Sequence, residues 1–127
     1  LDPSTVFAAT VQGLVASWDG GERWQNFDGL LGRVAVTAVA FHPREPQQVY
    51  AYAASPELGF LHSADGGRTW NPLGLFFGPR EGAAHLALHP ADPKVVYLST
   101  FSADLYRSTD GGRTLQKLVE AGRVLAP

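Results

Sequence analysis

At the centre of the chain stands Ser63-Ala64-Asp65-Gly66-Gly67-Arg68-Thr69-Trp70, and the same pattern occurs twice more. The other copies are Ser17-Trp18-Asp19-Gly20-Gly21-Glu22-Arg23-Trp24 and Ser108-Thr109-Asp110-Gly111-Gly112-Arg113-Thr114-Leu115. Their aspartates lie 46 and 45 positions apart along the 127 residues. Self-similarity at that period is typical of architectures built from stacked units, such as a propeller.

The repeat extends beyond this motif. Short runs rich in valine and aromatic residues follow an Asp-Pro or Glu-Pro pair at residues 2–9, 45–52 and 92–99. Small apolar runs at residues 36–43 and 83–90 end in His-Pro. Such runs, bounded by Gly, Pro and Asp, indicate β-strands. Each unit is therefore predicted to have four strands, A to D, with the Ala- and Val-rich strand A innermost.

The same alignment predicts how the chain divides. Residues 5–28 supply strands B, C and D of one blade, and residues 34–73 and 83–118 form two full blades. Residues 122–127 match the segment before a strand A and are predicted to start the next innermost strand. The fold class is all-β, with about three four-stranded antiparallel blades. Propellers close with about four to eight blades, so we expect further blades in a longer chain or a ring closed by several copies.

The shared motif is predicted to be a structural turn. Paired glycines tolerate the positive φ of a tight hairpin between strands C and D. The Asp carboxylate can accept hydrogen bonds from the amides of the same turn. A Trp after the turn falls on a face that can become buried. The residues given this structural role are Asp19, Gly20, Gly21, Trp24, Asp65, Gly66, Gly67, Trp70, Asp110, Gly111 and Gly112. The first copy has Arg23 in place of Thr and the third has Leu115 in place of Trp, so both should be held less well than the second.

The motif resembles the Asp-box, or BNR repeat, and the resemblance covers essentially the whole chain. Asp-box repeats occur in sialidases, sortilin-type receptors, xyloglucanase-type glycoside hydrolases and photosystem II assembly factors. The resemblance implies a β-propeller fold but no single activity, because these families do unrelated things. A sialidase would also bring a Phe/Tyr-Arg-Ile-Pro motif, which this sequence lacks.

Composition narrows the class of partner. Ten basic and 12 acidic residues give a net charge of −2, without a basic run that would favour nucleic acid. Cysteine is absent, which excludes disulfides and thiolate chemistry within these residues. No apolar run approaches the roughly 18–20 residues that span a bilayer. We expect no cofactor.

Neither metal binding nor catalysis is predicted. His85 and His89 would lie about 13 Å apart on one strand, too far for one ion. Glycoside hydrolysis needs two carboxylates about 5–10 Å apart. Six carboxylates belong to the Asp-boxes and the turns before proline, and of the six others Glu57 and Glu81 are the pair considered, because they could lie on one face in neighbouring blades or loops. An enzymatic activity is left open, with the sequence leaning against it, and no catalytic residue is assigned.

Binding is predicted at the face opposite the Asp-box turns. Strand order places the A–B and C–D turns on one face and the B–C and D–A loops on the other. The longest D–A loop, residues 74–82, carries apolar and charged side chains, and two B–C loops lie beside it. The candidate ligand-binding residues are Phe76, Phe77, Arg80, Glu81, Glu57 and Phe101. The structural alternative is that one or both of the paired phenylalanines cover the edge of a blade.

We therefore expect a non-catalytic binding or assembly module that recognises protein or carbohydrate through propeller loops. The alternative is a fragment of a sialidase-like or xyloglucanase-like glycoside hydrolase whose catalytic residues lie outside this chain. Because most proteins with this repeat are found outside the cytoplasm, a periplasmic or secreted location is expected.

Overall fold

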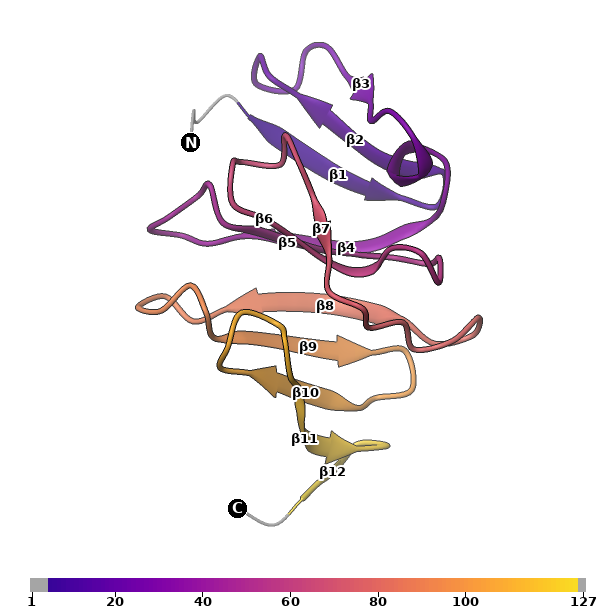
Figure 1. Cartoon of the computed structure of the whole chain (residues 1–127), viewed down its shortest axis with the longest axis vertical. Helices are drawn as coiled ribbons and strands as arrows, with labels where there is room; N and C mark the ends of the chain where they lie inside the picture. Colours follow the sequence, from indigo (N-terminus) through magenta and orange to yellow (C-terminus); the bar gives the residue numbers. More distant parts are fainter. Residues whose placement is uncertain (1–4, 126–127) are drawn as a thin grey trace.

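The computed structural model describes residues 5–125 and consists of three antiparallel sheets with one short 3₁₀ turn (Figure 1). The first sheet contains β1 (Val6–Thr10), β2 (Gly13–Ser17) and β3 (Gln25–Asn26). The turn η1 (Leu30–Gly32) leads to the second sheet, with β4 (Val36–Phe41), β5 (Val49–Ala53), β6 (Gly59–Ser63) and β7 (Asn71–Pro72). The third sheet contains β8 (Ala83–Leu88), β9 (Val96–Thr100), β10 (Leu105–Ser108), β11 (Gln116–Glu120) and β12 (Arg123–Val124). The all-β prediction is confirmed.

Within each sheet, consecutive strands pair as neighbours. β5 pairs with β4 on one side and with β6 on the other, and all five of its residues are buried. The hairpin from β5 to β6 closes at Gly59, whose φ is 57°, and a Cβ there would lie 2.1 Å from the Leu75 carbonyl oxygen. Glycine is therefore required both by the backbone conformation and by the close approach of the following loop.

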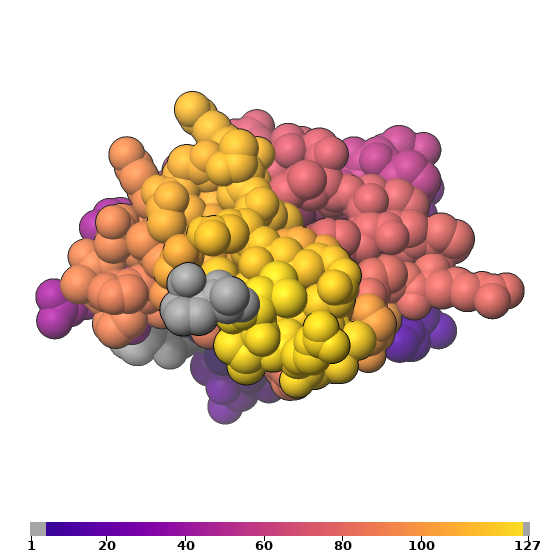
Figure 2. Space-filling model, turned by 90° about the horizontal axis from the view of Figure 1, so that it is seen from below, coloured from indigo at the N-terminus to yellow at the C-terminus, as the bar shows by residue number. Residues whose placement is uncertain are grey.

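The sheets stack one behind another. Strands β4 and β8 are in contact, and the Thr37 hydroxyl donates a hydrogen bond of 2.5 Å to the Ala83 carbonyl. Figure 2, seen from the C-terminal end, shows the third sheet in front, with parts of the second sheet visible beside it. This order, with the Ala- and Val-rich strands side by side, is the one predicted for innermost strands.

Two apolar clusters hold the stack together. The first lies between the first and second sheets and includes Phe7, Leu14 and Leu61. The second lies between the second and third sheets and includes Tyr50, Phe60 and Leu98. We call these contacts the first seam and the second seam.

The turns separate into two groups as predicted. The Gly66 amide donates to the Gln47 carbonyl, and the Gly111 amide donates to the Lys94 carbonyl, so the second and third Asp-box turns lie against the A–B turns of their own sheets. On the other side, the Phe60 amide donates to the Leu75 carbonyl and joins a D–A loop to strand C. In Figure 1 the A–B turns of the second and third sheets lie at the left and the B–C turns at the right.

Two details differ from the expectation. Strand D, predicted from the repeat to begin at Trp24, Trp70 or Leu115, begins one residue later in every sheet and has two residues in β3 and β7. The segment predicted to begin a next innermost strand instead contains β12, which pairs antiparallel with β11 at the outer edge of the third sheet. Ala121 and Gly122, with φ of 50° and 83°, turn the chain back onto β11 and make this pairing available. The predicted Asp-Pro turn at residues 2–3 and residues 126–127 lie outside the described residues.

Within residues 5–125, none of the helical structure is long and apolar enough to cross a membrane.

Candidate functional site: a polar groove in the second seam

Each Asp-box turn is closed by its own serine and aspartate. In the second copy the Ser63 hydroxyl donates to Asp65 Oδ1 at 2.7 Å and accepts from the Gly67 amide at 2.9 Å. Asp65 Oδ1 also accepts from the amides of Arg68 and Thr69 at 3.1 and 2.9 Å. The first and third copies repeat the serine and aspartate contacts. These carboxylates are therefore engaged within their own turns.

A threonine adds one more bond in two of the copies. Thr69 and Thr114 donate hydroxyl hydrogen bonds to the second carboxylate oxygen of Asp65 and Asp110 at 2.5 and 2.6 Å. The Thr69 side chain and amide lower the pKa of Asp65 to about 2. The pKa of Asp110 is lowered by the equivalent Thr114 contacts. For Asp19 the pKa is also lowered, first by the Arg23 amide and then by the Ser17 hydroxyl, without a threonine.

The second glycine of the motif also contacts the preceding sheet. A Cβ on Gly67 would lie 2.3 Å from Phe7 Cε2, and one on Gly112 would lie 2.7 Å from Leu73 Cδ1. At the first copy, a Cβ on Gly21 would meet only the ring of Trp24, at 3.8 Å. The turn is therefore also a packing surface, which makes glycine necessary for space as well as for its φ of 90° at Gly67.

The two motif tryptophans differ in environment. Trp70 packs against the first cluster, with its ring centroid 6.5 Å from that of Phe27. Trp24 was expected on a buried face but is 46% exposed. Trp70 is covered by the sheet before its own, whereas no described residues form a sheet on that side of Trp24. Both indoles still donate to the carbonyl of the second motif glycine, Gly21 or Gly67, at 2.9 Å.

The loop face brings several of the predicted binding residues together. Glu81 accepts hydrogen bonds from the Ser102 hydroxyl and from the Gly82 amide, the latter at 3.0 Å. The Phe101 amide donates to the Gly82 carbonyl, and the Phe101 side chain is 56% exposed. Partial burial would raise the pKa of Glu81, but the hydrogen bonds from Ser102 and Gly82 outweigh it and lower the pKa. Glu81 is therefore held as a carboxylate.

The paired phenylalanines lie against the second cluster. Phe77 stacks between Tyr52 and Tyr106, with ring centroids 5.5 Å away on each side. Its backbone amide donates a hydrogen bond to the Tyr52 hydroxyl. Phe76 is also packed on this cluster. This is the edge-covering arrangement considered as the alternative for these rings.

The other two predicted residues of this face are exposed. Arg80 lies at the tip of the β7–β8 connection. Glu57 lies in the β5–β6 turn, where it accepts a long hydrogen bond of 3.5 Å from the Ser55 hydroxyl. Among the described residues, no hydrogen bond or ion pair joins Glu57 to Glu81. The structure therefore brings Glu81 to Phe101 and leaves Glu57 within its own turn.

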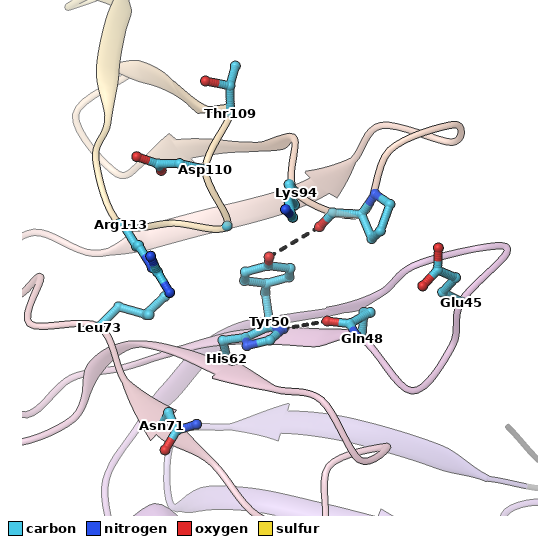
Figure 3. A pocket seen from close by; sticks show the side chains of 12 residues that line it. Glu45, Gln48, Tyr50, His62, Asn71, Leu73, Lys94, Thr109, Asp110 and Arg113 are labelled. Carbon is cyan, nitrogen blue, oxygen red and sulfur yellow. Dashed lines mark hydrogen bonds between the residues drawn. The ribbon is translucent and has the colours of Figure 1, made fainter.

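A groove of about 720 Å³ opens on the opposite face, at the second seam (Figure 3). One wall comes from the second sheet and its A–B turn, and the other from the A–B and Asp-box turns of the third sheet. The lining residues are Glu45, Gln48, Tyr50, His62, Asn71, Leu73, Pro93, Lys94, Thr109, Asp110, Gly111 and Arg113. The sequence interpretation treated this face as structural and did not predict the groove.

The floor of the groove is ordered by hydrogen bonds. The Tyr50 hydroxyl donates to the Pro93 carbonyl at 3.2 Å, across the seam. Burial raises the pKa of Tyr50 to about 12, and the charges of Asp110 and Asp92 act in the same direction. His62 Nε2 donates to Gln48 Oε1 at 2.6 Å, with its ring 4.7 Å from that of Tyr50. Burial lowers the pKa of His62, so this ring is neutral at pH 7.

Unpaired charges surround this floor. Within residues 5–125 the ion pairs are made by Lys117, with Asp104 and Glu120. The charged groups of Glu45, Lys94 and Arg113 are therefore free to meet a ligand, whereas Asp110 is occupied by its own turn. Figure 3 shows the Arg113 side chain directed toward Leu73 and the interior of the groove.

Two of the remaining histidines, His42 and His89, hydrogen-bond within turns. His42 is 1% exposed, accepts from the amides of Arg44 and Glu45 at Nδ1, and donates from Nε2 to the His89 carbonyl at 2.8 Å. His89 Nδ1 accepts from the Ala91 amide, and His85 is exposed. In the described part of the chain, no three His, Cys, Asp or Glu side chains gather closely enough to hold a metal ion.

Comparison with known proteins agrees with this architecture. The family model Sortilin-Vps10, described as sortilin, neurotensin receptor 3, matches residues 12–124. The vacuolar protein sorting/targeting protein 10 of Aspergillus clavatus is 29% identical over 132 aligned residues, covering 95% of this chain and 9% of the relative. The xyloglucanase Xgh74A of Acetivibrio thermocellus is 35% identical over 97 residues, covering 65% of this chain and 12% of the relative.

A solved structure shows the same fold. YCF48 bound to a D1 peptide superposes with a TM-score of 0.70 at 22% identity, covering 91% of this chain and 38% of that chain. This chain spans about a tenth of the length of the two curated relatives described above. Its three sheets are propeller blades, as the motif predicted, and the match over residues 12–124 shows that the chain belongs to the Sortilin-Vps10 family.

Proposed function

We propose that this chain is a non-catalytic binding module that recognises an extended segment of another protein through the groove in the second seam. The observation that carries the proposal is the groove itself, with free charges of both signs at Glu45, Lys94 and Arg113 above a hydrogen-bonded floor. A peptide offers both charge signs and regularly spaced backbone polar groups, which suits such a lining.

Two similar proteins support a protein ligand. One solved structure with this fold is of YCF48 bound to a D1 peptide, and one curated relative is named for protein sorting and targeting. Neither resemblance identifies a partner for this chain. They make protein recognition the first class of ligand to test.

The proposal is tested by two arrays and three variants. Labelled chain is applied to a peptide array and to a glycan array that includes xyloglucan oligosaccharides. We expect peptide binding that weakens about tenfold or more, roughly 1.4 kcal/mol, in Lys94→Glu and in Arg113→Glu. Arg80→Glu, an equal charge reversal on the loop face, is the matched control and should bind as the parent chain does.

The control also tests the surface predicted from the sequence. The sequence predicted a contact surface on the loop face, at Arg80, Glu81 and Phe101, whereas the present proposal assigns binding to the groove. If Arg80→Glu abolishes binding while the groove variants retain it, the loop face is the site and the groove proposal fails. Binding to glycans without binding to peptides would also overturn it.

The second candidate is a part of a glycoside hydrolase, favoured by the 35% identity to a xyloglucanase. Hydrolysis of xyloglucan by this chain, lost in Glu81→Gln or Glu57→Gln, would establish that function and reject the binding module. We expect no hydrolysis, because the hydrogen bonds to Glu81 lower its pKa, whereas a general acid needs a raised pKa. A periplasmic or secreted location and a ring closed by several copies also remain proposals. Light scattering tests the second of these.

A further inference from the structure

The first seam contains a cation–aromatic contact between two consecutive Asp-box turns. The guanidinium of Arg68, in the second turn, lies 5.2 Å from the ring centroid of Trp18, in the first turn. Trp18 also meets the Phe7 ring edge-on at 5.7 Å. The indole therefore fills the mouth of the first seam, between the two turns.

The second seam has the same arginine without the ring. Arg113 occupies in the third turn the position that Arg68 has in the second. The residue equivalent to Trp18 is Ala64, whose side chain is a single methyl group. Both positions follow the motif serine and precede the motif aspartate, in turns closed by the same hydrogen bonds. The second seam thus has an arginine whose counterpart in the first seam lies over an aromatic ring, but it has no ring at the corresponding position.

Other residue differences between the first and second repeats make this space in the second seam larger and more polar. The positions of Phe27 and Ala16 in the first seam correspond to Leu73 and His62 in the second. Beside Trp18 and Phe27, a pocket lined by residues of the first sheet alone has a volume of about 150 Å³. At the second seam the groove has about 720 Å³, which is ample for one side chain of a ligand.

We propose that the groove takes an aromatic side chain of a bound peptide, which lies against Arg113 in the place that Trp18 occupies beneath Arg68. This inference rests on the proposed function and specifies which peptides are recognised. Leu73, which is half-buried, supplies apolar surface for the ring. Asn71 supplies polar atoms for an indole N–H or a phenol hydroxyl, since its side chain makes no hydrogen bond within residues 5–125. A ring against a guanidinium gains free energy that an aliphatic side chain of similar size does not.

The test compares two peptides that differ at one residue. The isotope-labelled chain is titrated, with NMR detection, with acetylated and amidated Gly-Ser-Trp-Ser-Gly and with the same peptide carrying Leu in place of Trp. We expect the Trp peptide to bind about fivefold more tightly and to shift the Arg113 side-chain signal. Equal affinity of the two peptides, or no binding of the Trp peptide up to about 5 mM, would overturn the inference.

Three variants test where the aromatic ring of the peptide binds. Ala64→Trp supplies the missing indole from the chain itself and should abolish the preference for the Trp peptide while keeping a dispersed spectrum. Arg113→Ala should also reduce the preference to about twofold or less. Arg68→Ala, which removes the equivalent arginine of the first seam, is the control and should retain the preference for the Trp peptide. Retention of the preference in both Ala64→Trp and Arg113→Ala would overturn the inference.

The two proposals fail in different ways. If the peptide array shows binding but no preference for aromatic residues, the aromatic inference is wrong and the binding module stands. If no peptide on the array binds, both are rejected. Binding of a xyloglucan oligosaccharide against Arg113 in place of the peptides would also overturn the inference, because it assigns the groove to a sugar.

Discussion

The two seams join the same kind of sheet by different chemistry. In the first seam, Phe7 is surrounded by the rings of Trp18, Phe27 and Phe41, with centroids 5.1–5.7 Å away. In the second seam, the position of Phe7 is taken by Tyr50, whose hydroxyl donates across the seam to Pro93. The aromatic seam is filled, whereas the hydrogen-bonded seam leaves a groove open. The comparison shows how one repeat can hold a scaffold together at one interface and offer a binding surface at the next.

The largest effect should come from adding a methyl group at the tightest point of the first seam. Gly67→Ala places a Cβ 2.3 Å from the Phe7 ring at a φ of 90°. Left-handed strain of about 1–2 kcal/mol and overpacking of about 1–3 kcal/mol together predict a loss of about 2–5 kcal/mol. Urea denaturation measures the free energy of unfolding.

Gly20→Ala is the matched control for that variant. Gly20 has a similar φ of 80°, but nothing lies within 4 Å of its added Cβ. Its loss should stay at about 1–2 kcal/mol, the cost of the backbone conformation alone. Equal losses for the two variants would mean that the contact with Phe7 does not restrict the seam.

The second seam should be most sensitive at its buried histidine. His42→Ala removes the donor to the His89 carbonyl and the acceptor for two turn amides at a position that is 1% exposed. Leaving those groups unsatisfied should cost about 2–3 kcal/mol by urea denaturation. His89→Ala keeps the backbone carbonyl and removes only an exposed side chain, so it should change stability by less than about 0.5 kcal/mol. A comparable loss in both variants would contradict the role of His42 as a bridge.

Removing the Trp18 indole should make the first seam resemble the second seam, with space open for a ligand. Trp18→Ala deletes a half-buried ring in contact with Phe7 and Arg68, so we expect a loss of about 1–3 kcal/mol. The variant should also gain weak binding of the Trp peptide, now against Arg68. Urea denaturation and the same NMR titration measure the two effects. A destabilised variant with no gain in binding would indicate that the opened space collapses.

The fold was predictable because it depends on what the repeats share. Three copies of the Asp-Gly-Gly turn and the Val-aromatic runs identify the strands, their order and the two groups of turns. The motif is regular because its side chains stabilise their own turn: those of Ser63 and Asp65 hydrogen-bond within it.

The groove was not predictable in that way because it depends on where the repeats differ. Ala64 in place of Trp18, and His62 in place of Ala16, are single exchanges within otherwise matching units. A position-by-position comparison of the copies would have marked them, but only the stacking of the sheets shows that His62 lines a groove together with residues of the third sheet. The same holds for Phe77, whose two stacking partners come from different sheets.

The smallest effect concerns the threonine that distinguishes the second Asp-box from the first. Thr69→Arg copies the first turn, where Arg23 stands at this position, and removes the largest cause of the lowered pKa of Asp65. The pKa of about 2 should rise toward, but not reach, its ordinary value, because the bonds from Ser63 and the turn amides remain. NMR titration of the Asp65 carboxyl carbon measures the change, with Asp110 as an internal control that keeps its Thr114 contact.

The sign of the pH dependence follows from the lowered pKa. A carboxyl whose pKa is lower in the folded chain stabilises it above the pKa of the unfolded chain, about 4, and this stabilisation is lost as the pH falls toward 2. In Thr69→Arg the loss between pH 4 and 2 should be smaller than in the parent chain, and its size is limited because water screens the exposed turn. An unchanged titration of Asp65 in Thr69→Arg would show that the threonine bond does not distinguish the two turns. The second Asp-box would then be no better held than the first.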